Sequence, residues 1–217
     1  MISTKQKGFT IIELMISTAV FSTILLVVLT SITQIGRMYY KGITTAQTQE
    51  VARTILDKIS QEVQFSGQSS SPIAAYNAPN GVICIGKTRF FYVLNKISRS
   101  AQHAFWVDTD NNNSGCVVGA ANMNVAQPTP AGNNGAELLA EGMRVVVLGA
   151  TSSGNNLWNI DVKVVFGADD LIESIDASGT TVSQVAFPQF TTCKGSQIGT
   201  QFCAVSQLTS TVLKRVP

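Results

Sequence analysis

The chain has 217 residues, of which 45% are hydrophobic and 13% are charged, and its mean hydropathy is +0.21. This composition excludes an intrinsically disordered chain and a highly charged nucleic-acid-binding protein. The net charge of +2 is unevenly distributed, because residues 37–100 carry eight bases and three acids whereas residues 101–193 carry two bases and nine acids. Such an asymmetry can orient self-association, but the sequence favours a chance distribution of solvated charges.

The first element in chain order is an apolar run. Residues 14–35 contain no charged side chain and are dominated by Leu, Ile, Val, Met and Phe. As a helix, this run would span roughly 33 Å, enough to cross a bilayer core of about 30 Å. It is longer than the apolar region of a cleavable secretory signal, which has about 7–15 residues. Lys5 and Lys7 precede the run, which predicts a cytoplasmic N-terminus and a single membrane crossing, with the remaining chain outside that membrane.

Glu13 is an unexpected residue for a plain membrane anchor. It lies between Ile12 and Leu14, at the start of the apolar run. An acid in this position is costly unless it is neutralised or paired with a cation. Two interpretations follow: Glu13 lies at the level of the lipid headgroups, or it meets a positive charge that another part of the assembly supplies.

The residues around Glu13 favour the second interpretation. They read Lys5-Gln6-Lys7-Gly8-Phe9-Thr10-Ile11-Ile12-Glu13-Leu14-Met15. This segment resembles the prepilin-type cleavage and methylation motif of type IV pilins and type II secretion pseudopilins: a short basic leader ending in Gly, then Phe, with Glu as the fifth residue of the mature chain. The resemblance implies that a prepilin peptidase cleaves between Gly8 and Phe9, that residues 1–8 with Lys5 and Lys7 are removed, and that the Phe9 amine is N-methylated.

Cleavage would place a cationic amine about one helical turn from Glu13. When related helices pack side by side with a stagger, the Phe9 amine of one helix can meet Glu13 of its neighbour. Buried polar pairs of this kind can specify register, so we predict that Glu13 sets the register of assembly. The partners implied are the prepilin peptidase, other pilin subunits that bind through the N-terminal helix, and the inner membrane with its assembly-platform proteins.

The apolar pattern becomes periodic after the membrane run. Val51, Ile55, Ile59 and Val63 recur every four residues, as expected for one buried face of an amphipathic helix. We predict one helix from about residue 9 to residue 64, with residues 9–36 as a transmembrane or filament-core segment and residues 37–66 as an amphipathic half. Gly, Ser and Pro residues at 67–72 end it, and residues 67–217 form a β-rich extracytoplasmic domain.

β-branched and aromatic residues predict strands in this domain at residues 81–85, 88–94, 104–107, 143–148, 157–166 and 202–213. The expected fold class is α+β, with a long N-terminal helix packed on an antiparallel β-sheet domain, as in the pilin fold. Within the pilin group the layout is most similar to PilW-like or J-type minor subunits, through residues 53–59 and 141–145 and Leu157-Trp158.

Four cysteines lie in the part of the chain predicted to face an oxidising compartment. Cys193 and Cys203 enclose a nine-residue loop rich in Gly and Gln, so we predict that they pair and leave Cys84 with Cys116. Other pairings stay open. Zinc is disfavoured, because the chain has no Cys-x-x-Cys spacing and a single histidine.

An acidic loop is the one candidate cofactor site. Asp108, Asp110, Asn112 and Ser114 occupy positions 1, 3, 5 and 7 of a calcium-loop pattern. The sixth and twelfth positions lack the Gly and Glu that this loop needs, so a solvated turn is the favoured interpretation and we predict no cofactor.

Residues 87–99 combine basic and aromatic side chains, as a single-stranded nucleic-acid platform would. A buried strand with solvated basic ends is the favoured interpretation, so nucleic acid is not the expected partner.

The sequence therefore predicts a structural, minor subunit of a type IV pilus or pilus-like filament. The alternatives are a minor pseudopilin of a type II secretion system, a DNA-uptake pilin and a major pilin. An extracytoplasmic enzyme is disfavoured, because there is no Gly-x-Ser-x-Gly motif, no phosphate loop and no His/Asp cluster, and because Asp169 and Asp170 would point to opposite sides of a strand. The expected location is the inner membrane before assembly, and then a cell-surface pilus or a periplasmic pseudopilus.

Overall fold

The structure is a computed structural model that describes residues 8–65, 73–77, 80–99, 103–109, 135–175, 178, 180–181, 188–195 and 199–215. The chain divides into two compact units, Met1–Tyr40 and Lys41–Pro217. The predicted boundary after residue 36 and the other predicted segment limits stay predictions.

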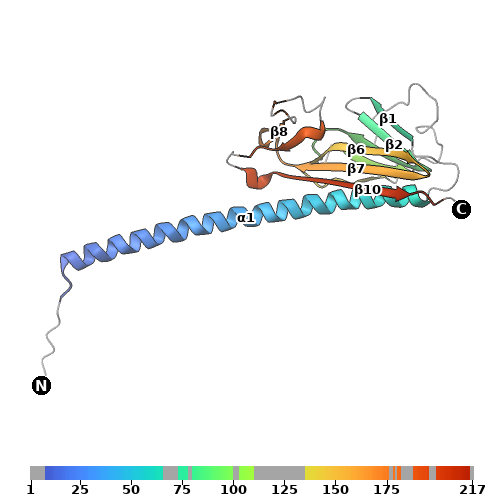
Figure 1. The fold of residues 1–217 in the computed structure, drawn as a ribbon. Coiled ribbons are helices and arrows are strands. Elements are labelled where there is room, and N and C mark those ends of the chain that lie inside the picture. Colours follow the sequence, from blue (N-terminus) through green and yellow to red (C-terminus); the bar gives the residue numbers. More distant parts are fainter. Residues whose placement is uncertain are drawn as a thin grey trace, which may run out of the picture. The chain divides into compact units, whose positions relative to one another are not determined.

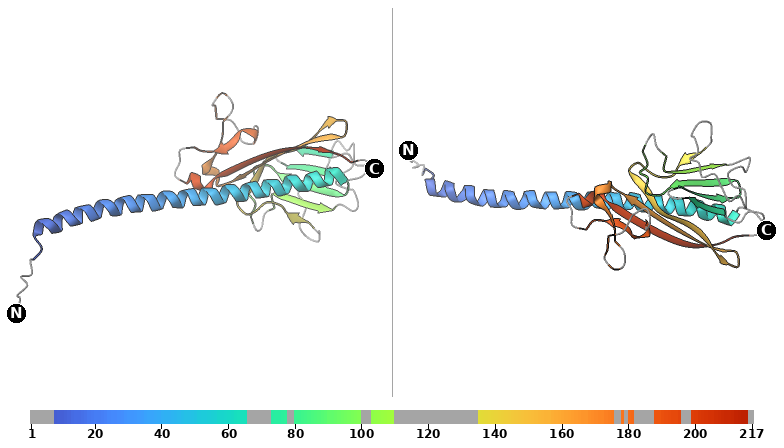
Figure 2. Two further views of the ribbon diagram at one scale, coloured as in Figure 1. Left: turned by 60° about the horizontal axis from the view of Figure 1, so that its bottom comes forward. Right: turned by 90° about the horizontal axis from the view of Figure 1, so that it is seen from above.

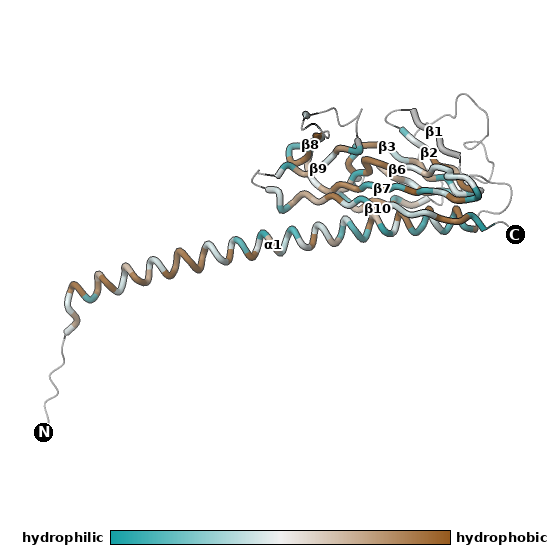
Figure 3. The backbone as a smooth tube through the Cα atoms, viewed as in Figure 1, coloured by the Kyte–Doolittle hydropathy of each residue, from teal (hydrophilic) through white to brown (hydrophobic). Residues whose placement is uncertain are grey.

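One long helix, α1 (Ile11–Phe65), belongs to both units (Figure 1). Within the first unit its large apolar side chains are exposed, including Phe21 at 65% and Leu26 at 62%. Figure 3 shows that this part of α1 is mostly hydrophobic. The described chain contains one helix, α1, that is long and apolar enough to cross a membrane.

Six of the eight Ser, Thr and Gln side chains in residues 14–35 are hydrogen-bonded within the helix. Six Ser and Thr hydroxyls donate hydrogen bonds to backbone carbonyls three or four residues earlier; they belong to Thr18, Ser22, Thr23, Thr30, Ser31 and Thr33. A hydroxyl that already has an acceptor does not need water. These residues are therefore compatible with lipid or with a packed helical bundle.

The second unit contains the amphipathic part of α1. Its buried residues are Thr44, Thr48, Ala52, Ile55, Ile59 and Val63. One step in this series is three residues and the others are four, so the stripe stays on one face of a helix with 3.6 residues per turn. The predicted stripe is confirmed except at Val51, which is half-buried beside the fully buried Ala52.

Strands build two larger sheets and one small sheet in this unit. The first sheet has five antiparallel strands in the order β1-β2-β3-β4-β5: β1 (Ile73–Asn77), β2 (Asn80–Ile85), β3 (Thr88–Val93), β4 (Phe105–Thr109) and β5 (Ala136–Glu137). The second has the order β10-β7-β6: β6 (Met143–Gly154), β7 (Leu157–Phe166) and β10 (Ala204–Leu213). The third pairs β8 (Ile172–Ser174) with β9 (Thr191–Cys193). Three short 3-10 helices complete the described elements: η1 (Asp169–Leu171), η2 (Pro188–Phe190) and η3 (Thr200–Phe202).

The two larger sheets and the helix share one hydrophobic core. In the right-hand view of Figure 2, the green strands and the red strand β10 lie on opposite sides of the cyan end of α1. Ile55 and Ile59 belong to the same buried cluster as Phe90 and Phe105 of the first sheet and Val162 of the second. Burial of each such side chain stabilises the fold by about 1.5–3 kcal/mol. The predicted α+β architecture, a long helix packed on antiparallel sheets, is confirmed.

Several strands differ from the prediction. Strand β6 continues past residue 148 to Gly154, because Asn155 and Asn156, both at positive φ, form a two-residue hairpin turn that keeps it paired with β7. Strands β1, β5, β8 and β9 were not predicted. Each has five residues or fewer and so gives little alternation to detect. Residue 202 ends the 3-10 helix η3 instead of opening β10.

Candidate functional site

The predicted cleavage site lies just before α1. Gly8, Phe9 and Thr10 are exposed and precede the first helical residue, Ile11. The Phe9 side chain is 82% exposed, and a Cβ atom added at Gly8 would meet nothing within 4 Å. An exposed segment outside regular structure is the kind of backbone that a peptidase can bind. Lys5 and Lys7 lie outside the described residues.

Glu13 belongs to a capping box at the start of the helix. The Thr10 backbone N–H donates to Glu13 Oε2 over 3.0 Å, and the Thr10 hydroxyl donates to the same oxygen over 2.8 Å. In return, the Glu13 N–H donates to Thr10 Oγ1 over 3.3 Å. This reciprocal Thr-x-x-Glu arrangement satisfies backbone donors that have no intrahelical acceptor.

The capping box leaves the carboxylate able to bind a cation. Both hydrogen bonds from Thr10 go to Oε2, and within the described residues Oε1 has no hydrogen bond. The carboxylate lies in the first turn of α1, where the helix dipole stabilises negative charge. Sequence reasoning missed Thr10 as a partner of Glu13, although the Thr-x-x-Glu spacing was the signal that could have found it. The register role of Glu13 stays a prediction.

The Cys193–Cys203 disulfide is present, with an S–S distance of 2.07 Å. It ties the end of β9 to the residue before β10. Cys203 is fully buried in a second hydrophobic cluster, with Val165 and Ile172 among its members. Cys84 is also disulfide-bonded, and its predicted partner, Cys116, lies outside the described residues.

The two bases of residues 101–193 are both buried. Arg144 is 1% exposed; its guanidinium donates to the Gly167 carbonyl oxygen over 2.8 Å and forms an ion pair with Asp169. Asp169 and Asp170 lie on the 3-10 helix η1 and not on a strand, so the prediction that they are adjacent strand residues is wrong. The physical reason is the turn at Gly167, whose φ of 139° favours glycine and ends β7.

Lys163 is the second buried base. It is 7% exposed, and its Nζ donates to the Gln189 carbonyl oxygen over 2.6 Å. Burial lowers the pKa of the Lys163 amine from its ordinary value of 10.5, and the Asp161 carboxylate raises it by a smaller amount. Both positive side chains of residues 101–193 are therefore withdrawn from solvent.

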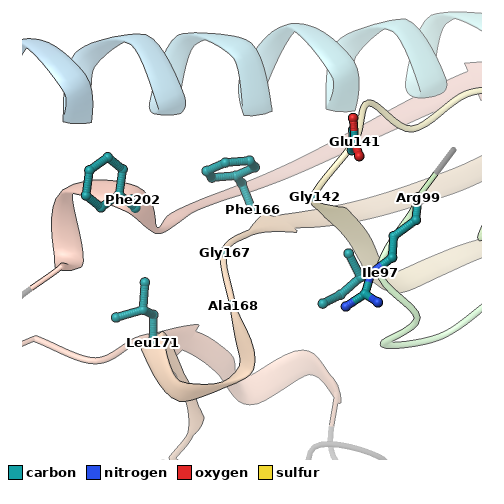
Figure 4. Close-up of a pocket in the computed structure, with 9 residues that line it drawn as sticks. All are labelled: Ile97, Arg99, Glu141, Gly142, Phe166, Gly167, Ala168, Leu171 and Phe202. Carbon is teal, nitrogen blue, oxygen red and sulfur yellow. The ribbon is translucent and has the colours of Figure 1, made fainter.

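A pocket of about 360 Å³ opens on the surface of the second unit (Figure 4). Its lining is mostly apolar and includes Phe166, Leu171 and Phe202, which lie at one side. Arg99 and Glu141 lie at the other side, and both are exposed. Phe202 itself is 45% exposed. The pocket thus combines an apolar floor with one positive and one negative side chain, and sequence patterns gave no indication of it.

Of the four residues considered as calcium ligands, the structure describes one, Asp108. Asp108 is buried on β4, and its carboxylate forms a two-bond pair with the Arg89 guanidinium; the Nε–Oδ1 bond measures 2.8 Å. A carboxylate held in this way is already neutralised. Asp110, Asn112 and Ser114 lie outside the described residues. In the part of the chain that is described, no group of three or more His, Cys, Asp or Glu residues could hold a metal ion.

The aromatic residues considered as a nucleic-acid platform are core residues. Phe90, Phe91 and Tyr92 are at most 5% exposed on β3, and Arg89 is paired with Asp108. Base stacking requires an exposed aromatic face. Strand β3 does not present one.

Comparison with known proteins adds one finding at the N-terminus. Residues 3–29 match a family described as the prokaryotic N-terminal methylation motif. The searches of curated proteins and of solved structures found no match. The matched segment contains the predicted cleavage site, the capping box and the first part of the apolar helix. It supports a prepilin of the type IV pilin or pseudopilin kind, anchored to a membrane by its N-terminal helix.

Proposed function

We propose that this chain is a structural subunit of a type IV pilus or pilus-like filament, present as a minor subunit, matured by cleavage after Gly8 and assembled through α1. The observation that carries this proposal is the methylation motif over residues 3–29, followed directly by an apolar helix. The large side chains of that helix are unburied within its own unit. Such a surface is stable only in lipid or against other helices.

Maturation changes the electrostatics of the helix start. Before cleavage, the Glu13 carboxylate is held by Thr10 alone among the described residues. Cleavage removes Lys5 and Lys7 and creates the Phe9 ammonium group. The Phe9 amine of a neighbouring copy then binds Glu13 through the oxygen that Thr10 leaves unbonded. Because an unpaired charge in an apolar bundle is costly, helices that are out of register are disfavoured.

A minor pseudopilin of a type II secretion system is the alternative within the same proposal, because it would use the same cleavage and the same helix packing. Buried aromatic side chains on β3 weigh against the DNA-uptake interpretation. The proposed role is structural and not enzymatic. The prepilin peptidase, other pilin subunits, and inner-membrane assembly-platform proteins are its proposed partners. The final location is the cell surface or the periplasm.

Processing is tested by replacing Gly8 with Trp in the full-length chain. A Cβ atom at this position meets nothing within 4 Å, and Gly8 precedes the first helical residue, so the substitution should not disturb the helix. We expect an uncut precursor, whereas the unchanged chain should begin with N-methylated Phe9; N-terminal sequencing and mass spectrometry distinguish the two. Gly36→Ala, also at an uncrowded glycine, is the control and should be processed normally. A working filament that contains the chain with residues 1–8 attached would contradict the proposal.

Register is tested by Glu13→Ala. We expect cleavage to be largely intact and incorporation into sheared filaments to fall at least tenfold, because the carboxylate that selects the register is lost. Glu50→Ala removes an exposed acid from the same helix and should incorporate normally. Normal incorporation of the Glu13 variant would refute the register argument while leaving the processing argument in place.

A further inference from the structure

The second unit carries two complementary patches at opposite ends of β10. The strand begins at Ala204, two residues after Phe202, which lines the pocket. At the other end, the Arg215 N–H donates to the Gln64 carbonyl oxygen over 3.3 Å, which places the end of β10 beside the end of α1. Ten residues of extended strand separate the two ends by about 33 Å.

The apolar side chains of the patch at the end of α1 are exposed. Phe65 is 68% exposed, and Leu213 is 55% exposed. The Arg215 guanidinium carbon lies 6.0 Å from the centre of the Phe65 ring. Glu62 is one helical turn before Phe65 and is half-buried. We call these four residues the distal knob: an apolar pair accompanied by one base and one acid.

The pocket has the matching chemistry. Its apolar floor contains Phe166, Leu171 and Phe202, and its charged residues are one acid, Glu141, and one base, Arg99. The ion pairs found in the described residues do not include either of them. A ring in the pocket would be covered by aromatic and aliphatic side chains, with a charge of each sign available to a partner.

We propose that the distal knob of one copy of this chain binds the pocket of a second copy. Phe65 enters the apolar floor, Arg215 pairs with Glu141 of the second copy, and Glu62 pairs with its Arg99. The two surfaces differ, so the contact is head-to-tail. Head-to-tail contacts need not close into a ring, so in a filament where this chain is a minor subunit they join those copies that lie next to each other. The inference therefore rests on the proposed filament function and adds a contact outside the N-terminal helix.

The contact is too small to hold two copies together alone. One buried aromatic residue covers about 150–250 Å², well below the roughly 1,200 Å² of a stable interface. It acts when the N-terminal helices already hold the copies close together, since tethering raises the effective concentration. A separate second unit is therefore expected to be monomeric.

The test is site-specific photocrosslinking in the full-length chain, expressed in cells that assemble it. A photoreactive phenylalanine analogue replaces exposed Phe65, and mass spectrometry maps the crosslinked peptides in the sheared fibre fraction. We expect crosslinks to residues 141–142, 166–171 or 199–203 of a second copy. Crosslinks confined to other surfaces, or to other proteins, would overturn the inference.

Charge reversal tests the pairing. Glu141→Arg and Arg215→Glu should each lower the yield of this crosslink about fivefold, and the double variant should restore it to within about twofold. Glu50→Arg makes the same charge change at an exposed residue of α1 that belongs to neither patch, and should leave the yield unchanged. Failure of the double variant to restore the yield would overturn the pairing.

N-terminal sequencing of the same fibre fraction separates the two proposals. Mature chain in the fibre with crosslinks outside the pocket would overturn the contact and leave the filament function standing. Absence of mature chain from the fibre would overturn both.

Discussion

Removal of the Cys193–Cys203 disulfide should lower the stability of the fold by an amount that can be calculated from the structure. The two residues are separated by 10 positions. The chain-entropy treatment of a loop of this length gives a stabilisation of about 2.7 kcal/mol at 25 °C, because the open chain regains that conformational freedom when unfolded. Cys203 is fully buried, so alanine at both positions also removes sulfur atoms from a packed cluster. We expect the loss of the entropic stabilisation to exceed the loss of packing by the sulfur atoms.

A fragment beginning near Arg37 is the suitable material, because it omits the apolar segment and is expected to be soluble and monomeric. In a chain of this size, 1 kcal/mol shifts the Tm by about 2–4 °C. Cys193→Ala with Cys203→Ala should therefore lower the Tm by about 5–10 °C. Circular dichroism melting without reductant measures this shift with the Cys84 bridge retained.

Reducing agent supplies the second measurement. It should lower the Tm of the unchanged fragment by more than that of the double alanine variant, because the variant has one bridge fewer to lose. A Tm shift below about 2 °C for the variant would refute the argument that this bridge restricts the unfolded chain. The bridge adjoins Phe202, so its loss should also weaken the proposed pocket contact.

Three further predictions concern buried groups. Asp169→Ala should destabilise the fold by about 1.5–3 kcal/mol in urea unfolding, because the buried Arg144 guanidinium loses its carboxylate partner but keeps its bond to the Gly167 carbonyl oxygen. Arg144→Met should cost less than about 1 kcal/mol, because Asp169 is 78% exposed and remains hydrated. Equal costs would contradict this. The Lys163 amine has a lowered pKa in the folded state, so the unfolded state keeps its proton to higher pH. The free energy of unfolding of the unchanged chain, relative to that of Lys163→Met, should therefore rise with pH from the lowered pKa up to 10.5. A difference in unfolding free energy that stays constant with pH would contradict this. Gly81→Ala would place a Cβ 2.1 Å from the buried Tyr92 ring and should cost about 1–3 kcal/mol, measured by denaturant unfolding; an unchanged midpoint would contradict this.

Much of the fold could be predicted because its signals are local. The helix α1, the stripe through Ile55, Ile59 and Val63, and the strands β2, β3 and β7 follow from periodicity and residue type within short windows. Short strands such as β5 and β8 could not be predicted, since their pairing depends on neighbours that are distant in sequence.

Asp169 shows the same limit for individual residues. Sequence reasoning treated it as one of two adjacent strand acids, whereas η1 places it against the Arg144 guanidinium from β6. A contact across 25 positions leaves no local pattern. The favoured assignment of residues 90–92 to a buried strand, by contrast, is confirmed, because consecutive aromatic residues carry that information themselves.

The amino-acid sequence by itself determined the maturation motif, the apolar helix and the α+β class, because cleavage motifs and hydrophobic periodicity are properties of consecutive residues. Only the tertiary structure decided that Arg144 and Lys163 are buried, that Phe166, Leu171 and Phe202 share a pocket with Arg99 and Glu141, and that Phe65 and Arg215 meet at the other end of β10. Those groupings depend on how distant segments pack around one core, where burial and proximity arise from the whole fold.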